Sequence, residues 1–236
     1  MNTFIDPADA ALLLVDHQSG LFQTVKDIDV RQLRTNTVAL AKAAKLLSLP
    51  VITTASVPEG PNGPLMPEIA EIVPNATFLA RKGEVNAWDA PAFPKAVRAT
   101  GKHTLVIAGV WTSVCVAFPA LAALAEGYKV YAVIDASGDV STTAQQATVA
   151  RLAQAGVIPV STNGLVAELQ KTWNRPDALE FAGIFASIAP NYAAEIESHV
   201  AAATGAAKRA TRTQEGHVHA HDLVRGTADD AAAISA

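Results

Sequence analysis

The 236-residue sequence predicts an α/β fold in which helices cover both faces of a doubly wound parallel sheet. Half of the residues are hydrophobic but only 6% are aromatic, so Ala, Val, Leu and Ile form the core. That composition is typical of parallel sheets buried under helices. Short apolar runs also alternate with segments of helical periodicity, which predicts repeated βα units. Right-handed crossovers then favour a doubly wound order of strands.

Six strands are expected where short apolar runs end at polar or turn-forming residues: Ala10–Val15, Val51–Ala55, Ala76–Arg81, Thr104–Val110, Lys129–Asp135 and Val157–Thr162. Helical spacing predicts five helices that alternate with them: Val30–Leu49, Pro91–Thr100, Ser113–Glu126, Thr142–Ala155 and Leu165–Trp173. Three of these helices are followed by glycine, at Gly101, Gly127 and Gly156. Glycine commonly ends a helix because it adopts a left-handed conformation without strain.

We expect a single domain over residues 1–204, in which residues 176–204 add C-terminal helices outside the repeat. These helices are rich in Ala, Phe and Ile, which favours burial against another subunit, because a large exposed apolar patch on a monomer is unusual. Phe181, Phe185 and Tyr192 are the expected interface anchors. The alternative is that the helices fold back onto their own domain.

The last segment, residues 205–236, is small, charged and weakly periodic. It is expected to form a tail that is either disordered or packed on a neighbouring subunit. Three histidines stand at alternate positions in it, His217, His219 and His221. Their spacing suits a metal ion, but a histidine-rich tract is only a compositional hint, so their role is left open.

Charge and hydropathy exclude several classes of protein. The chain has 18 basic and 22 acidic residues and a net charge of −4, so it has neither the basic footprint of a nucleic-acid-binding protein nor a polybasic membrane patch. No apolar stretch reaches the roughly 18 residues of a spanning helix, and the N-terminus lacks the positive region of a signal peptide. A single cysteine excludes an intrachain disulfide framework. A cytoplasmic protein is expected.

Three chemically complementary residues follow strands of the predicted sheet. Asp16 follows the first strand, Lys82 the third and Cys115 the fourth. Ligands of open α/β sheets bind at the carboxyl ends of the strands, so a carboxylate, an ammonium and a thiol are expected to converge there. Arg81 is the competing cation. Read singly, Asp16 is equally well explained as a helix cap and Lys82 as a solvated surface residue.

Cys115 is the most informative of the three. Thr112 or Ser113 is a natural N-cap, which places Cys115 in the first turn of a helix. The partial positive charge there is expected to lower the thiol pKa, and the free N–H groups to stabilise an oxyanion on a substrate carbonyl. The alternative is an inert core thiol, since cysteine is among the most buried residue types.

Taken together, three stretches resemble the isochorismatase-like cysteine hydrolase superfamily: LLLVDHQSGLF, KGEVNAW and AGVWTSVCV. Within it the YcaC-like group is the most similar, because the chain also carries NAWD, CVAFPALAALAEGY and EFAGIFASIAPNY. The resemblance implies a Rossmann-like three-layer fold whose six strands have the order 3-2-1-4-5-6. It also implies a homo-oligomer, possibly an octamer in the YcaC-like group, that acts on a small-molecule substrate.

The resemblance further implies an Asp16–Lys82–Cys115 triad that hydrolyses the C–N bond of a small amide or ureido compound. Asp16 deprotonates Cys115, Lys82 orients the site, and a thioester forms and is then hydrolysed. A cis peptide is expected between Val110 and Trp111, with the backbone N–H groups of Trp111 and Cys115 binding the oxyanion.

The residues expected to line the substrate pocket are Gln18, Phe22, Asn86, Trp88 and Trp111. His17 is expected to point away from Asp16, because successive side chains of an extended strand alternate.

The sequence departs from the nicotinamidases of this superfamily, which carry a metal site after the second strand. Here that region reads TTASVPEGPNG, with no histidine and only Glu59, so we expect no metal and no other cofactor. The physiological substrate is not named by the resemblance. Two alternatives to a hydrolase stay open, a catalytically idle member of the fold and a redox-sensing thiol protein that lacks a resolving cysteine.

Overall fold

The computed structural model describes residues 4–202, 204 and 205. Its centre is a six-stranded sheet in the order β3-β2-β1-β4-β5-β6, with every neighbouring pair parallel. The strands are β1 Ala10–Val15, β2 Val51–Ser56, β3 Thr77–Arg81, β4 Thr104–Gly109, β5 Lys129–Val133 and β6 Ile158–Val160. The predicted fold class and strand order are therefore confirmed.

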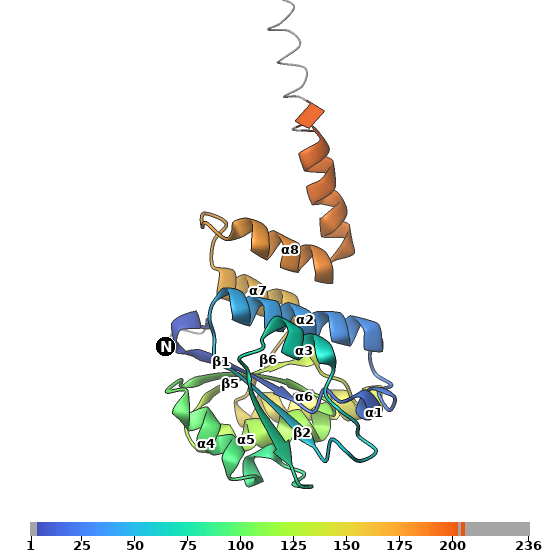
Figure 1. Ribbon diagram of the computed structural model, residues 1–236, viewed down its shortest axis with the longest axis vertical. Coiled ribbons are helices and arrows are strands. Elements are labelled where there is room, and N and C mark those ends of the chain that lie inside the picture. Colours follow the sequence, from blue (N-terminus) through green and yellow to red (C-terminus); the bar gives the residue numbers. More distant parts are fainter. Residues whose placement is uncertain (1–3, 203, 206–236) are drawn as a thin grey trace, which may run out of the picture. The chain divides into compact units, whose positions relative to one another are not determined.

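Helices cover both faces of this sheet, as Figure 1 shows. The helices are α1 Ser19–Phe22, α2 Val30–Leu46, α3 Pro67–Ile72, α4 Ala92–Ala99, α5 Ala117–Ala125, α6 Thr142–Ala155, α7 Thr162–Gln170 and α8 Ala178–Ile188. Three short 3₁₀ turns, η1 Pro7–Asp9, η2 Ala87–Asp89 and η4 Ile134–Ala136, and one π-helical turn, η3 Thr112–Val116, complete the order. α2, α3 and α7 lie on one face of the sheet, and α4, α5 and α6 lie on the other.

The sequence specifies the ends of several helices locally. Asp29 accepts a hydrogen bond from the backbone N–H of Gln32 at the start of α2 (3.0 Å), and Ser141 caps α6 in the same way. Such side-chain caps satisfy N–H groups that a helix start leaves free. Gly156 ends α6 with a φ of 104°, a left-handed conformation that glycine adopts at no steric cost.

The helix expected at Ser113–Glu126 begins differently. Its first turn is the π-helical η3, and only Ala117–Ala125 is α-helical. The cause is the Trp111 carbonyl, which accepts hydrogen bonds from the backbone N–H groups of Val114 (3.2 Å), Cys115 (2.7 Å) and Val116 (3.3 Å). The turn that carries the cysteine is thus wider than an ordinary helical turn.

The predicted C-terminal helices are present. The chain divides into two compact units, Met1–Ile188 and Ala189–Ala236, and each contains part of this helical region. In the first unit α8 packs on α2 and α7, and Phe181 and Phe185 are only 0% and 8% exposed. These two aromatic residues are therefore core residues of their own chain and not interface anchors, as the fold-back alternative predicted.

In the second unit residues 190–202 are helical. The assignment of these helices to one domain with residues 1–188 stays a prediction. His217, His219 and His221 lie outside the described residues. Within the described part of the chain, no helix has the length and hydropathy needed to cross a membrane.

Candidate active site

Three strand ends meet at the carboxyl edge of the sheet. Asp16 follows β1, where its backbone N–H donates to the Thr54 carbonyl of β2 (2.9 Å). On the other side, the Val110 N–H at the end of β4 donates to the Val15 carbonyl (3.1 Å). Asp16 has a φ of 58°, a left-handed conformation that aspartate tolerates better than most residues. The first strand thus ends in a sharp turn between β2 and β4.

Arg81, the last residue of β3, reaches this turn across β2. Its guanidinium forms an ion pair with the Asp16 carboxylate, and the two side chains are only 1% and 2% exposed. Its Nε donates to Thr54 Oγ1 (3.2 Å), and Nη1 donates to the carbonyls of Glu84 and Val85. A planar guanidinium with five donors suits such a buried, many-sided site better than an ammonium.

The structure does not bring Lys82 to the site. Lys82 is exposed, and its backbone N–H donates to the Glu84 carboxylate (2.8 Å). Successive strand residues point to opposite faces, so only one of the two neighbouring cations can face Asp16. The expected place of Lys82 beside Asp16 is therefore wrong, and Arg81, which the sequence offered as the competing cation, occupies it.

Cys115 lies beside Asp16 and is 7% exposed. Its thiol pKa is raised well above the usual range, first because burial disfavours the thiolate, and then because Asp16 adds negative charge and accepts a hydrogen bond from the thiol. A hydrogen bond from the Trp111 backbone and the charge of Arg81 act in the opposite direction but do not reverse the shift. The expected lowering of the thiol pKa is therefore wrong, since burial and Asp16 outweigh the helix start.

The two oxygens of Asp16 differ. Oδ2 pairs with Arg81, whereas Oδ1 is buried and has no hydrogen-bond partner among the described residues. The carboxylate thus binds a cation through one oxygen and keeps the other unpaired near the thiol whose pKa it raises.

The backbone before η3 has the expected cis peptide between Val110 and Trp111. The two backbone groups expected to bind an oxyanion are not equivalent. The Cys115 N–H donates to the Trp111 carbonyl (2.7 Å), so it is already bonded, contrary to expectation. The Trp111 backbone instead bonds to the Cys115 sulfur, which makes its N–H the group that faces the reacting atom.

Four of the five expected pocket residues have structural partners instead. The Gln18 side chain is 0% exposed, and its amide joins the end of β2 to the following loop through Ser56 and Gly63. Asn86 caps η2 by accepting from the Trp88 N–H (3.0 Å). A side-chain amide with all of these partners is not free to bind a substrate.

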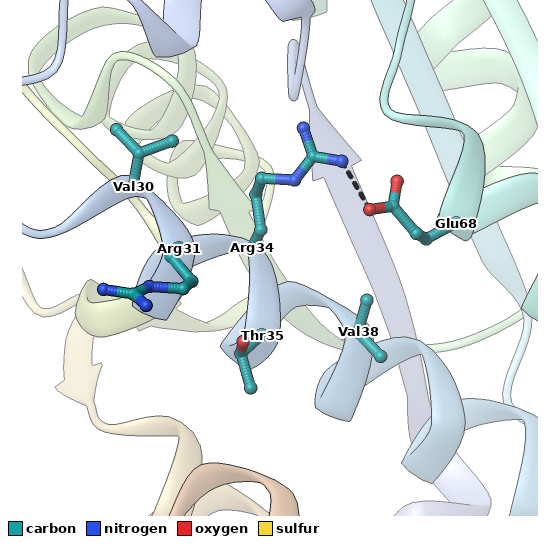
Figure 2. A pocket seen from close by; sticks show the side chains of 6 residues that line it. All are labelled: Val30, Arg31, Arg34, Thr35, Val38 and Glu68. Carbon is teal, nitrogen blue, oxygen red and sulfur yellow. Dashed lines mark hydrogen bonds and ion pairs between the residues drawn. The ribbon is translucent and has the colours of Figure 1, made fainter.

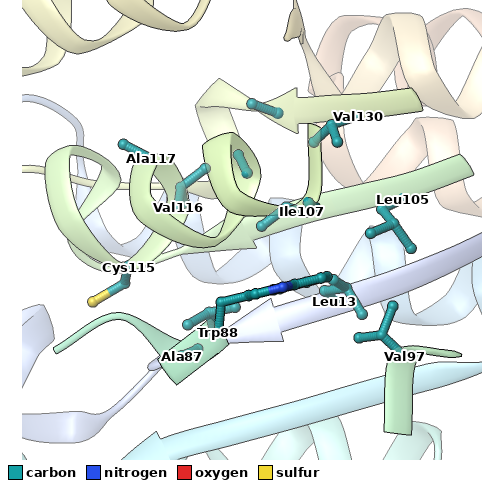
Figure 3. Packing of buried hydrophobic residues seen from close by; sticks show 14 of the residues in the cluster. Leu13, Ala87, Trp88, Val97, Leu105, Ile107, Cys115, Val116, Ala117 and Val130 are labelled. Carbon is teal, nitrogen blue, oxygen red and sulfur yellow. The ribbon is translucent and has the colours of Figure 1, made fainter. Parts of the chain in front are cut away.

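The aromatic pair Phe22 and Trp88 is buried as well. Phe22 is 5% exposed, and Arg34 stacks on its ring at 5.5 Å. Trp88 lies in the core beside Leu13 (Figure 3), where its Nε1 donates to the Glu126 carboxylate (2.8 Å). Both are buried residues with partners in their own chain, and their place in the substrate pocket stays a prediction.

Trp111, like Asn86, is one of the expected pocket residues that are not buried. It is partly exposed, and its indole Nε1 donates to the Thr24 hydroxyl (2.6 Å). Thr24 was missed in the sequence because nothing near it marks a contact with a residue so far along the chain.

His17 points away from the Asp16 carboxylate, as the strand alternation predicts. Its Nε2 lies 3.0 Å from the Ala136 carbonyl, and the side chain is 0% exposed. Burial lowers its pKa to about 4, although the hydrogen bond to Ala136 acts the other way. His17 is therefore neutral near pH 7 and ties the end of β1 to the segment after β5.

Other described parts of the molecule lack the chemistry of this site. Among the described residues, no cluster of three or more His, Cys, Asp or Glu side chains is arranged to hold a metal ion. A cavity of about 440 Å³ is lined by residues of α2 and by Glu68 of α3, and the ion pair of Arg34 with Glu68 crosses it (Figure 2). None of its lining residues belongs to the group around Cys115.

Comparison with known proteins adds to this geometry. The family model of the isochorismatase domain matches residues 10–164. The chain is 46% identical to "Probable hydrolase YcaC" of Escherichia coli over 188 residues, which cover 80% of this chain and 90% of that protein. It is 28% identical to isochorismatase domain-containing protein 2 of Bos taurus, over 69% of this chain and 76% of the relative.

Two solved structures are similar over nearly their whole length. YcaC from Pseudomonas aeruginosa, solved with hexane-2,5-diol and covalent acrylamide, is 45% identical with a TM-score of 0.82, over 84% of this chain and 98% of that one. YcaC from Escherichia coli, described as an octameric hydrolase of unknown specificity, is 44% identical with a TM-score of 0.82, over 85% and 98%.

Proposed function

We propose a reaction for this chain, which belongs to the isochorismatase family and is a YcaC-like hydrolase. It cleaves the C–N bond of a small amide or ureido compound, without a metal ion, through a thioester on Cys115. The observation that carries the proposal is the buried Asp16 carboxylate, which pairs with Arg81 through one oxygen, has its other oxygen unpaired, and interacts with the Cys115 thiol. A base fixed against a buried nucleophile is the arrangement that nucleophilic catalysis needs.

In the first half-reaction Asp16 accepts the proton of the Cys115 thiol as the sulfur attacks the substrate carbonyl. A C–S bond forms, and the carbonyl oxygen becomes an oxyanion. The C–N bond then breaks, and the proton held by Asp16 passes to the leaving nitrogen, which departs as ammonia or an amine. The raised thiol pKa fits this scheme, because the sulfur stays protonated until attack is coupled to proton transfer.

In the second half-reaction water attacks the thioester carbonyl, and Asp16 accepts a proton from that water. The C–S bond breaks, the carboxylic acid product leaves, and the proton returns to the sulfur. Asp16 therefore acts once as a base toward each nucleophile, which restores the starting protonation state at the end of the cycle.

Arg81 and Trp111 complete the proposed site. Arg81 holds Asp16 in place through its ion pair and its fixed guanidinium. The Trp111 N–H, which already faces the sulfur, is the donor that we assign to the oxyanion. The covalent acrylamide in the Pseudomonas aeruginosa relative supports a reactive nucleophile in this group of proteins.

We also propose that the chain forms a homo-oligomer, possibly an octamer, in the reducing environment of the cytoplasm. The octameric Escherichia coli relative supports the assembly, and a free nucleophilic thiol fits a reducing compartment. Light scattering tests the assembly, since the monomer has a mass of only 24.5 kDa. A monomer at micromolar concentration contradicts it.

Ammonia release from a panel of small primary amides and ureido compounds tests the reaction. We expect turnover of at least one compound by the wild type in the presence of a chelator, and a loss of at least about 10³-fold in Cys115→Ala. Equal turnover by Cys115→Ala contradicts the nucleophile, and loss of turnover with the chelator contradicts the metal-free reaction. A wild type that releases no ammonia from any compound favours the idle or redox-sensing alternatives.

A further inference from the structure

The residues around Trp111 are held by a segment that lies far from them in the sequence. This clamp segment, residues 137–139, follows η4. The Gly109 N–H donates to the side-chain hydroxyl of the first residue of the clamp segment (3.1 Å). The Thr112 N–H donates to the carbonyl of the second residue of the clamp segment (2.8 Å), and the Ser113 N–H donates to the carboxyl group of the third (2.8 Å). The N–H groups on both sides of Trp111 are thus bonded to the clamp segment.

Asp139, the last residue of the clamp segment, is 0% exposed. Besides the Ser113 N–H, its carboxyl group accepts from the Ser113 hydroxyl (2.9 Å) and from the Val140 N–H (2.8 Å). Its own N–H donates to the Asp27 carboxyl (2.6 Å). Among the described residues, no basic side chain forms an ion pair with it. Two of the three hydrogen bonds that its buried carboxyl group accepts therefore come from Ser113, at the start of η3.

We propose that Asp139 is a positioning residue, which sets the reactivity of Cys115 by capping the turn that carries the thiol. The N-cap residue of η3, Trp111, has no side-chain bond to the turn, so Asp139 supplies the cap in its place. Cys115 stands two residues beyond Ser113 and depends on this turn for its burial and its contact with Asp16. The proposal rests on Cys115 as the nucleophile, but its test requires no substrate.

The chain contains a matched cap that does not touch the site. Asp135 accepts from both the backbone N–H and the hydroxyl of Thr162, each at 2.7 Å, at the start of α7. The bonds are the same in kind and number as those from Ser113 to Asp139. Removal of either carboxyl group therefore removes one backbone and one hydroxyl bond at a helix start. Asp139 also accepts from Val140 and α7 keeps its own N-cap, Ser161, but only Asp139 holds the turn of Cys115.

The rate of alkylation of Cys115 by iodoacetamide, measured from pH 7 to 10, tests the proposal. In Asp139→Ala the turn loosens, the thiol loses the burial that raises its pKa, and alkylation at pH 8 becomes at least about fivefold faster. Asp135→Ala stays within about twofold of the wild type at a similar loss of thermal stability. Asp139→Asn, which keeps an acceptor for the Ser113 N–H, restores the wild-type profile. Asp16 and Arg81, the charged groups that face the thiol, are unchanged in every variant.

A rate in Asp139→Ala equal to or slower than that of the wild type contradicts the proposal, as does an equal acceleration in Asp135→Ala. If Asp139→Ala does not fold, Ser113→Ala decides, because it removes only the hydroxyl half of the cap. A smaller acceleration in Ser113→Ala then supports the positioning role, and an unchanged rate contradicts it. The cysteine is the only one in the chain, so the alkylated residue is unambiguous.

Discussion

Two arginine–carboxylate pairs in this molecule have the same chemistry and different surroundings. Arg81 and Asp16 meet at the strand ends with side chains 1% and 2% exposed. Arg34 and Glu68 meet in the cavity of Figure 2 with side chains 37% and 33% exposed. The buried pair lies beside a thiol, whereas the other pair is partly exposed to solvent. Burial, and not the ion pair itself, is what couples a carboxylate to a neighbouring nucleophile.

The largest expected effect separates the two pairs by stability. Arg81→Met leaves the Asp16 carboxylate buried without a partner, which costs about 3–5 kcal/mol of the free energy of unfolding. Arg34→Met removes a partly exposed pair and costs about 1 kcal/mol or less. Urea unfolding measures both. Equal losses of unfolding free energy in the two variants mean that the buried pair has no special role. A loss in Lys82→Met as large as that in Arg81→Met means that Lys82, and not only Arg81, lies at the site.

Lowering the pH gives a second test through His17, which follows Asp16 of the buried pair in the sequence. Its pKa is about 4 in the folded protein, below its ordinary value of 6.5, so the unfolded chain binds more protons between these values. The stability due to neutral His17 is therefore complete above pH 6.5 and is lost as the pH falls toward 4, by roughly 3 kcal/mol. His17→Asn is expected to flatten this part of the curve of unfolding free energy against pH. A curve with the wild-type slope contradicts the assignment.

The smallest expected effect concerns the thiol. Asp16→Asn removes the negative charge that helps to raise the pKa of Cys115, so the thiolate forms at lower pH. Alkylation by iodoacetamide at pH 8 is expected to become roughly tenfold faster. Glu68→Gln, in the exposed pair, leaves the rate unchanged. No difference between the two variants means that Asp16 does not act on the sulfur.

The sequence predicted the sheet well because apolar runs and glycine stops are local signals. β1 and α6 have the expected bounds. The strand order came from family resemblance, because no local signal contains it. β6 is shorter than expected, as fits an edge strand that contains Pro159, since proline cannot donate to a sheet.

The site was predicted less completely, and for physical reasons. Asp16 and Cys115 come together as expected, but the choice between Arg81 and Lys82 depends on which face each residue presents, and a shift of one residue in a strand reverses the faces. Trp88 was assigned to the pocket, and its indole N–H donates to the exposed Glu126 carboxylate. Partners so far apart in the sequence leave no local signal.

The central claim is that the Cys115 sulfur carries the acyl group of the substrate. Rapid acid quench followed by intact-mass spectrometry tests it most directly, with an amide that the protein hydrolyses. We expect a transient mass increase on Cys115 equal to the mass of the substrate minus that of its amine. This adduct should form and decay at least as fast as turnover, and it should be absent in Cys115→Ala. Hydrolysis that proceeds without this adduct, and at the wild-type rate in Cys115→Ala, contradicts it.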